Sequence, residues 1–195
     1  IYKSGTGDLN VKTTGAVKGA YTGMRLYNDG AGGDIIVNAT GDVTGDREWG
    51  IYAENNSAGK GITVNATNLT GQLDGIHTTQ NGTGDVNITT TGTVTGTVEQ
   101  GMDIYSFGSG ATTIKASGDV IGNQWGIYVD DLATGKDISI SATNVTANSL
   151  YDGIRAWHRG SGDLTIATTG MVKGATEDGI DAKNLGTSAA NLVIS

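Results

Sequence analysis

The sequence contains no cysteine and no proline. The missing cysteine excludes disulfide bonds and thiolate metal sites. Proline cannot donate a hydrogen bond to a sheet ladder, so its absence favours a continuously paired β-structure. The chain also lacks the run of about 20 apolar residues that spans a bilayer. No segment shows the apolar spacing of an amphipathic helix. We therefore expect an all-β chain, with no membrane insertion by this segment.

Positive charge is scarce. The chain has 12 Lys and Arg residues against 20 Asp and Glu residues, a net charge of −8 and a pI near 4.5. Proteins that bind nucleic acids present a basic patch or stripe to the phosphates. The charge balance therefore predicts that nucleic acid is not a partner.

A short pattern, glycine-apolar-any-apolar, occurs seven times at intervals of 25 to 27 residues. We refer to these segments as the Gly-led strands. They lie at 23–26, 50–53, 75–78, 101–104, 126–129, 153–156 and 179–182. A repeat of this length, built from residues that favour strands, indicates an array in one domain that covers residues 1–195.

Two more apolar columns recur within each repeat. The first is an apolar-any-apolar triplet at 9–11, 35–37, 62–64, 86–88, 112–114, 138–140, 164–166 and 192–194. The second is a single apolar residue at 17, 43, 69, 94, 120, 145 and 172. These columns predict three short strands per coil, none longer than about five residues. We expect a right-handed parallel β-helix of roughly seven coils with about 26 residues each. The chain starts and ends inside a repeat, which predicts a fragment of a longer rod.

The corner between the first and second strands has its own pattern. A Thr or Ser column is followed by a Gly or Asn column at Gly15, Gly41, Asn68, Gly92, Gly118, Asn144 and Gly170. Gly and Asn enter left-handed backbone space at low cost, so this column predicts a left-handed corner. The stacked Thr hydroxyls are expected to form hydrogen bonds between coils.

The repeat resembles the passenger regions of bacterial autotransporters, the type V secreted proteins. Segments such as Gly41–Gly45 (GDVTG) followed by Gly50–Ala53 (GIYA) carry the resemblance, which extends over essentially the whole chain. It implies an extracellular rod at the bacterial outer membrane, or a secreted one, that mediates adhesion, aggregation or host contact. The implied partners are a host cell-surface or matrix protein, a glycan, or copies on other cells. The family has no universal catalytic motif, so the resemblance implies no cofactor and no catalytic residue.

The positions that vary between repeats predict a binding face. They lie on the outward side of the Gly-led strands and in the loops before them. The candidate residues are Tyr27, Trp49, Tyr52, His77, Asp103, Tyr105, Trp125, Tyr128, Arg155 and Trp157. Exposed Tyr, Trp and Arg side chains commonly dominate binding energy at interfaces. The alternative is that these rings only cover an apolar corner.

Three kinds of chemistry compete with binding. Stacking places His77 beside Asp103, two members of a hydrolytic triad, but no serine is evident at their level. Acids on neighbouring coils could cleave polysaccharide, although their scatter over different columns favours solvated surface; they are Glu99, Asp103, Asp130 and Asp131. The Gly-x-Gly-Asp segments favour turn-stabilising aspartates over calcium sites. We therefore predict no catalytic residue, no metal and no cofactor. A carbohydrate-active enzyme and a structural spacer remain the alternatives.

Overall fold

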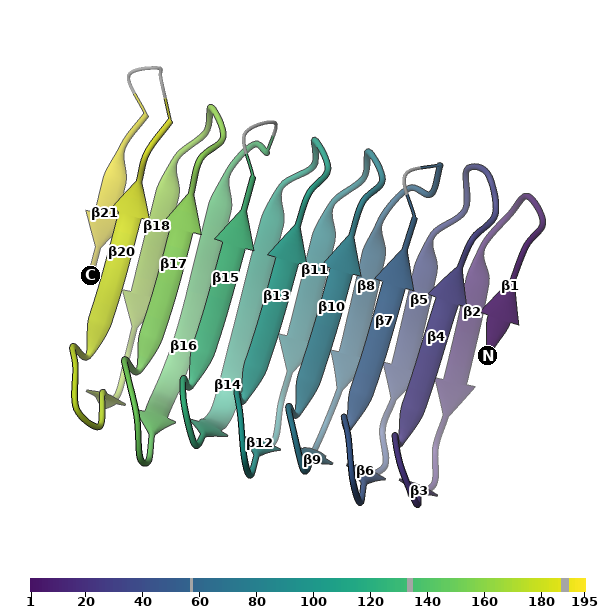
Figure 1. Cartoon of the computed structure of the whole chain (residues 1–195), viewed down its shortest axis with the longest axis horizontal. Helices are drawn as coiled ribbons and strands as arrows, with labels where there is room; N and C mark the ends of the chain where they lie inside the picture. The colour runs from purple at the N-terminus through teal and green to yellow at the C-terminus, as the bar shows by residue number, and fades with distance from the viewer. Residues whose placement is uncertain (57, 133–134, 187–189) are drawn as a thin grey trace.

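The computed structural model describes residues 1–56, 58–132, 135–186 and 190–195. Within these residues every regular element is a strand, and all strand pairs are parallel. The chain forms a right-handed β-helix of about seven coils with about 26 residues each, as the sequence predicts. Figure 1 shows the coils stacked along one axis, with the two termini at opposite ends of the rod.

The Gly-led strands and the N-terminal β1 form an eight-stranded sheet along one side of the rod (Figure 1). Its order is β1 (Tyr2–Lys3), β4 (Met24–Asn28), β7 (Ile51–Asn55), β10 (Ile76–Gln80), β13 (Met102–Ser106), β15 (Ile127–Asp131), β17 (Ile154–His158) and β20 (Ile180–Asn184).

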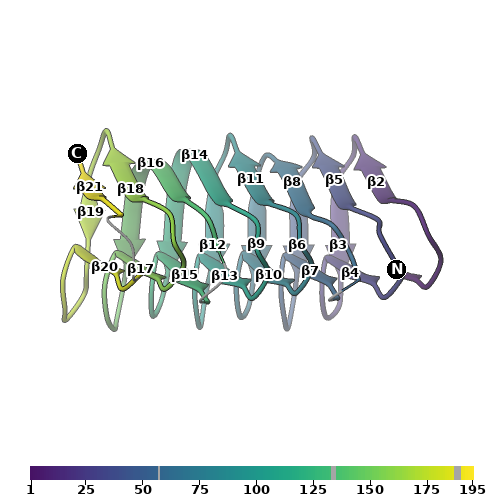
Figure 2. The ribbon, with the colours of Figure 1, turned by 90° about the horizontal axis from the view of Figure 1, so that it is seen from above.

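The first and second strands of the coils belong to a second sheet of 13 strands. The first strands form a row opposite the Gly-led strands (Figure 2). They are β2 (Leu9–Thr13), β5 (Ile35–Ala39), β8 (Ile62–Ala66), β11 (Val86–Thr90), β14 (Thr112–Gly122), β16 (Ile138–Ala147), β18 (Leu164–Thr168) and β21 (Leu192–Ile194). The separate second strands are β3 (Val17–Gly19), β6 (Val43–Gly45), β9 (Leu69–Gly71), β12 (Val94–Gly96) and β19 (Val172–Lys173).

Two strands are longer than the sequence predicts. β14 has 11 residues and β16 has 10, because each runs through the corner and supplies both the first and the second strand of its coil. Their pairing shifts register between Ala116 and Asp119. This irregularity bends the strand without ending the ladder. The expected limit of about five residues is therefore wrong for these two coils.

The predicted left-handed backbone conformation at the corner is also wrong. Among the described glycines, positive φ angles occur only at Gly7 and Gly32, neither of which belongs to the corner column. The corner glycines serve close stacking instead. A Cβ atom on Gly118 would lie 2.3 Å from the carbonyl oxygen of Gly92, and one on Gly41 would lie 2.4 Å from that of Gly15. At these two positions a side chain would press against the backbone of the preceding coil.

The core fills the centre of the coil, where apolar residues from all three strands meet. Ile35 and Val37 of β5, Val43 of β6, and Ile51 and Ala53 of β7 each expose at most 1% of their surface. Alternate side chains of a strand share a face, so the intervening residues point outwards. The inner coils therefore bury their constant apolar positions and turn most of their variable ones outwards, whereas Leu192 and Ile194 of the last coil are exposed.

Aspartates before the first strand link successive coils. The Asp8 carboxylate accepts the N–H of Asp34 at 3.1 Å, and Asp34 accepts that of Gly61 at 2.7 Å. Asp85 accepts the N–H of Ala111 at 2.8 Å. The side chains thus satisfy backbone donors at the turns, in the stabilising role that the sequence predicts.

Candidate binding face

The eight-stranded sheet presents the predicted face. Tyr52, His77, Asp103, Tyr128 and Arg155 occupy one register position on neighbouring Gly-led strands. The second outward position of these strands carries Tyr27, Tyr105 and Trp157. The remaining two residues, Trp49 and Trp125, directly precede the glycines of β7 and β15. All ten predicted residues therefore lie on one side of the rod, although Asp103 is buried there.

The aromatic rings touch in one continuous row. Tyr27 contacts Tyr52, with ring centroids 5.3 Å apart, and Tyr52 stacks parallel on His77 at 5.2 Å. His77 contacts Tyr105 at 5.7 Å, and Tyr105 contacts Tyr128 at 5.8 Å. The row crosses five coils.

Indole rings and a guanidinium group widen and extend this row. Trp49 contacts Tyr52 at 4.7 Å, and Trp125 contacts Tyr128 at 5.2 Å. The Arg155 guanidinium lies 5.4 Å from the Trp125 ring and 5.2 Å from the Trp157 ring. The rings are half-buried by these mutual contacts, so they are held in place while one side stays accessible.

His77 lies at the centre of a buried charge cluster. Its Nδ1 atom is 3.0 Å from Asp103 Oδ2 and 3.3 Å from Asp74 Oδ2. Trp49 Nε1 donates to Asp74 Oδ2 at 3.0 Å, and the backbone N–H of Gln100 donates to Asp74 Oδ1 at 2.8 Å. Burial lowers the pKa of His77, but the bonds to Asp103 and Asp74 outweigh it and raise the pKa to about 9. The ring is therefore an imidazolium at neutral pH.

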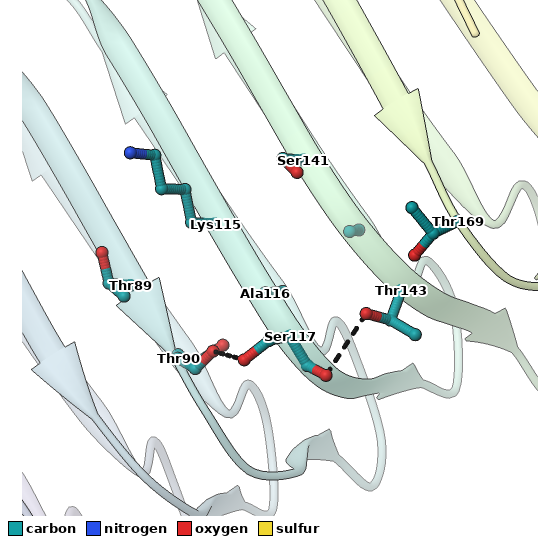
Figure 3. A pocket seen from close by; sticks show the side chains of 9 residues that line it. Thr89, Thr90, Lys115, Ala116, Ser117, Ser141, Thr143 and Thr169 are labelled. Atoms are coloured by element: carbon teal, nitrogen blue, oxygen red, sulfur yellow. Dashed lines mark hydrogen bonds between the residues drawn. The ribbon is translucent and has the colours of Figure 1, made fainter.

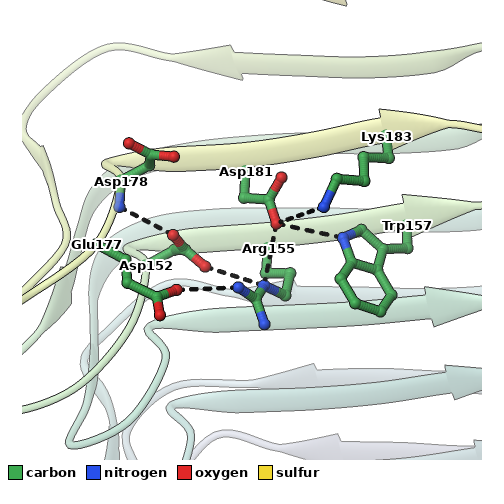
Figure 4. Close-up of polar contacts among 7 residues, drawn as sticks. All are labelled: Asp152, Arg155, Trp157, Glu177, Asp178, Asp181 and Lys183. Atoms are coloured by element: carbon green, nitrogen blue, oxygen red, sulfur yellow. Dashed lines mark hydrogen bonds and ion pairs between the residues drawn. The ribbon is translucent and has the colours of Figure 1, made fainter.

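Arg155 is the centre of a second cluster (Figure 4). Its Nε atom is 2.9 Å from Asp152 Oδ2 and 3.2 Å from Asp181 Oδ2, and its Nη2 atom is 3.0 Å from Glu177 Oε2. Trp157 Nε1 donates to the same Asp181 oxygen at 3.3 Å. The predicted pairing of His77 with Asp103 is confirmed, and Arg155 pairs with Asp181 in the same way.

The acids predicted to be solvated divide into two kinds. Glu99 and Asp130 are partly exposed, whereas Asp103 and Asp131 are buried, so the expectation is wrong for these two. Asp131 Oδ2 lies 2.8 Å from Nδ1 of His158, and both side chains are fully buried. Burial raises the pKa of Asp131.

This buried pair belongs to a polar column that the apolar repeat pattern did not predict. The last residue of each five-residue Gly-led strand is polar although its side chain points inwards; these residues are Asn28, Asn55, Gln80, Ser106, Asp131, His158 and Asn184. Asn28 Nδ2 donates to the Gly33 carbonyl at 2.8 Å, and Asn55 Nδ2 donates to that of Gly61 at 3.0 Å. The amide side chains of this column therefore satisfy carbonyl groups of the next loop, whereas Asp131 and His158 lie against each other. Strand parity combined with the repeat could have revealed it.

Two kinds of chemistry can be tested at the His77 cluster. Asp74, His77 and Asp103 form the one group in the described parts of the chain with the spacing of a metal site, their ligand atoms lying within 4.8 Å of one another. The equivalent group uses Arg155, which cannot bind a metal, in place of His77. Thr79 Oγ1 is 3.5 Å from His77 Nε2, too far for a strong hydrogen bond. A protonated imidazole also cannot act as a general base. The arrangement is best described as an ion-pair network.

A shallow groove follows the corner between the first and second strands. One hollow of about 180 Å³ is lined by Thr89, Lys115, Ser141 and their neighbours (Figure 3). Ser117 Oγ donates to the Thr90 carbonyl and Thr143 Oγ1 to the Ser117 carbonyl, both at 3.2 Å. This confirms the expected hydrogen bonding between coils. Ser117 and Thr143 are thus bonded to the backbone, whereas other polar side chains of the hollow, those of Thr89, Lys115, Ser141 and Thr169, are not drawn with such a bond (Figure 3).

Among the described residues no helix has the length and apolar character needed to cross a membrane. No family model matches the chain, and no curated protein or solved structure is significantly similar to it. Function must therefore be inferred from the face itself.

Proposed function

We propose that this chain is a rigid recognition rod that mediates adhesion, aggregation or host contact through the face of its Gly-led strands. The observation that supports this proposal most is the continuous row of half-buried rings from Tyr27 to Tyr128. Rings that are already ordered lose little conformational entropy on binding, so their contacts contribute more fully to affinity.

The repeat and the face together suggest where such a rod would act. The resemblance of the repeats to autotransporter passengers supports a place at the bacterial cell surface or outside the cell. The partner would be a host cell-surface or matrix protein, a glycan, or a second copy of the chain. The net charge of −8 disfavours nucleic acid. No step of the proposed role requires a cofactor or a catalytic residue.

One observation favours a second candidate, the structural spacer. The Arg155 charges are paired within the chain, and the rings pack on one another, as they would in a face that only stiffens the rod. A spacer would carry a distal tip away from the cell and would not lose attachment when its face is changed.

A triple variant distinguishes binding from spacing. Tyr105→Ala, Tyr128→Ala and Trp157→Ala remove three rings, and the purified rod is coated on beads and tested for attachment to cells and matrix. The control changes three outward Thr residues of the second strands, Thr44→Ala, Thr70→Ala and Thr95→Ala. Loss of attachment in the first variant alone supports the proposal, provided that circular dichroism shows intact strands.

Unchanged attachment by the correctly folded ring variant would contradict binding by this face and favour the spacer. A parallel assay with pectin, alginate and hyaluronan covers the enzyme alternative. Turnover of any of these polymers by the wild-type rod would replace the proposal with a carbohydrate-active enzyme.

A further inference from the structure

The binding face contains the same three-coil unit twice. The first unit contains Trp49, Asp74, His77, Glu99 and Asp103, and we call it the open unit. The second, the filled unit, contains Trp125, Asp152, Arg155, Glu177 and Asp181. Each residue of the filled unit follows its counterpart by 76 to 78 residues, which is three coils.

The two units share their geometry as well as their residue types. In each, an aspartate three residues before the basic residue contacts it, at 3.3 Å in Asp74–His77 and 2.9 Å in Asp152–Arg155. The other oxygen of this aspartate accepts a backbone N–H from the next coil, at 2.8 Å and 2.9 Å respectively. The units are therefore two versions of one site.

The aspartate of the third coil completes this equivalence. Asp103 lies 3.0 Å from His77, and Asp181 lies 3.2 Å from Arg155. Trp49 and Trp125 each lie beside the basic group, the first 5.6 Å from the His77 ring and the second 5.4 Å from the guanidinium.

The units differ in what reaches the glutamate. In the filled unit the guanidinium of Arg155 extends to Glu177 at 3.0 Å. The imidazole of His77 is shorter, and in the described residues the Glu99 carboxylate has neither an ion pair nor a hydrogen bond. Asp103 is only 5% exposed, yet its Oδ1 atom has no hydrogen-bond partner among the described groups.

The loops produce a second difference. In the filled unit the Tyr151 ring stacks on Trp125 with centroids 4.2 Å apart and an interplanar angle of 14°. The corresponding position in the open unit is Leu73, which supplies no ring to cover Trp49. In the filled unit the chain thus supplies a partner for the glutamate and a stacked ring for the indole. In the open unit Trp49 has the Arg25 guanidinium 5.6 Å from its ring, and among the described residues the Glu99 carboxylate has no such partner.

We propose that the open unit binds the guanidinium group of an arginine side chain from a partner protein, with the Glu99 carboxylate as its acceptor. The filled unit shows that a guanidinium on this face can pair with the glutamate, although there it belongs to the basic residue of the unit itself. The planar fork of a guanidinium matches carboxylates better than an ammonium does. The inference rests on the proposed function, since it assigns a partner chemistry to the same face.

Charge in the open unit supports a cation. Asp74, Glu99 and Asp103 carry three carboxylates against the one imidazolium of His77. Burial, and then the charges of Asp74 and Asp103, raise the pKa of Glu99. An incoming cation would relieve this repulsion. A neutral ligand such as a glycan would leave it unchanged.

The test uses two short peptides and isothermal titration calorimetry. One peptide alternates glycine with arginine, and the other has citrulline, a neutral relative of arginine, at each arginine position. We expect the wild-type rod to bind the arginine peptide, and the citrulline peptide at least about tenfold more weakly. Glu99→Gln should weaken arginine binding by about tenfold, while Glu177→Gln, the matched change in the filled unit, should leave it unaltered.

His77→Arg is the most direct test. This substitution places a guanidinium of the chain itself in the open unit, so the arginine peptide should no longer bind. Thermal unfolding should stay as cooperative as in the wild type, which would show that the variant is folded. Equal binding of both peptides, or unaltered binding after Glu99→Gln, would overturn the guanidinium site. So would binding of Zn²⁺ but not of the arginine peptide, which would make the cluster a metal site.

Failure of this inference is distinguishable from failure of the proposed function. If neither peptide binds but the triple ring variant still abolishes attachment, the guanidinium site is wrong and the recognition face stands. If peptide binding follows the expected pattern but attachment does not depend on the rings, the face has a site that adhesion does not use.

Discussion

His77 and Arg155 occupy the same position of two Gly-led strands and share two aspartate contacts. Each lies against an aspartate three residues earlier, Asp74 or Asp152, and against an aspartate of the following coil. Both positions therefore pair a basic side chain with two carboxylates. This equivalence predicts that the two clusters respond differently to pH, because arginine keeps its charge at every accessible pH and histidine does not.

Stability should fall as the pH rises through the titration of His77. Its pKa is about 9 in the folded chain and about 6.5 in the unfolded chain, so the folded state holds the proton more tightly. The stabilisation is fully present below pH 6.5 and is lost between pH 6.5 and about 9, by up to about 3 kcal/mol. Urea unfolding at a series of pH values between 6 and 10 measures this fall in the free energy of unfolding.

His77→Arg is the matched control for the pH experiment. It copies the filled unit, so the decline between pH 6.5 and 9 should largely disappear. A decline of equal size in this variant would assign the pH dependence to another group.

The buried Asp131–His158 pair should tolerate replacement of both partners but not of one. His158→Ala leaves the Asp131 carboxyl group buried without its partner and should cost about 3–5 kcal/mol of unfolding free energy. Replacing both residues by Asn copies the Asn28–Asn55 contact of the same column, where Nδ2 and Oδ1 are 3.1 Å apart. We expect the double variant to recover most of the loss in chemical denaturation. A single variant that costs less than about 1 kcal/mol would contradict the pairing.

The corner glycines should differ in their tolerance of alanine. Gly118→Ala places a Cβ atom 2.3 Å from the Gly92 carbonyl oxygen and should cost about 1–3 kcal/mol through overpacking. Gly15→Ala, in the same column at the N-terminal end of the stack, meets no atom within 4 Å and should change stability by less than about 0.5 kcal/mol. Thermal unfolding of both variants measures the difference. Equal losses of stability in the two variants would indicate that backbone conformation, and not close stacking, favours glycine in this column.

The turn aspartates should act as hydrogen-bond acceptors and not as calcium ligands. Asp85→Ala removes the acceptor of the Ala111 N–H and should cost about 1 kcal/mol, whereas Asp85→Asn keeps an oxygen there and should cost less. Calcium or a chelator should leave the melting temperature of the wild-type rod unchanged. A calcium-dependent rise of several degrees would contradict this role.

The burial of the core residues and the pairing of His77 with Asp103 could both be predicted from the sequence. The apolar columns at Ile35, Val37 and Val43 predicted the buried side of every coil, because strand parity alone decides which way a side chain points. The same parity, applied to neighbouring repeats, predicted that His77 lies beside Asp103, and the two residues are register partners. By contrast, the left-handed corner was a local interpretation of Gly and Asn, and stacking against the neighbouring coil overrode it.

The coil, its period, its core and the side that carries the variable residues can all be derived from the amino-acid pattern. They follow from a repeat of about 26 residues and from alternation within strands. The packing of one coil on the next, by contrast, is what buries Asp103 and Asp131, and what lets Arg155 reach Glu177 while Glu99, among the described residues, has no ion-pair partner. Burial and ion pairing here depend on how far each side chain reaches towards the next coil and on where the loops between strands run. The sequence of a single repeat does not specify either.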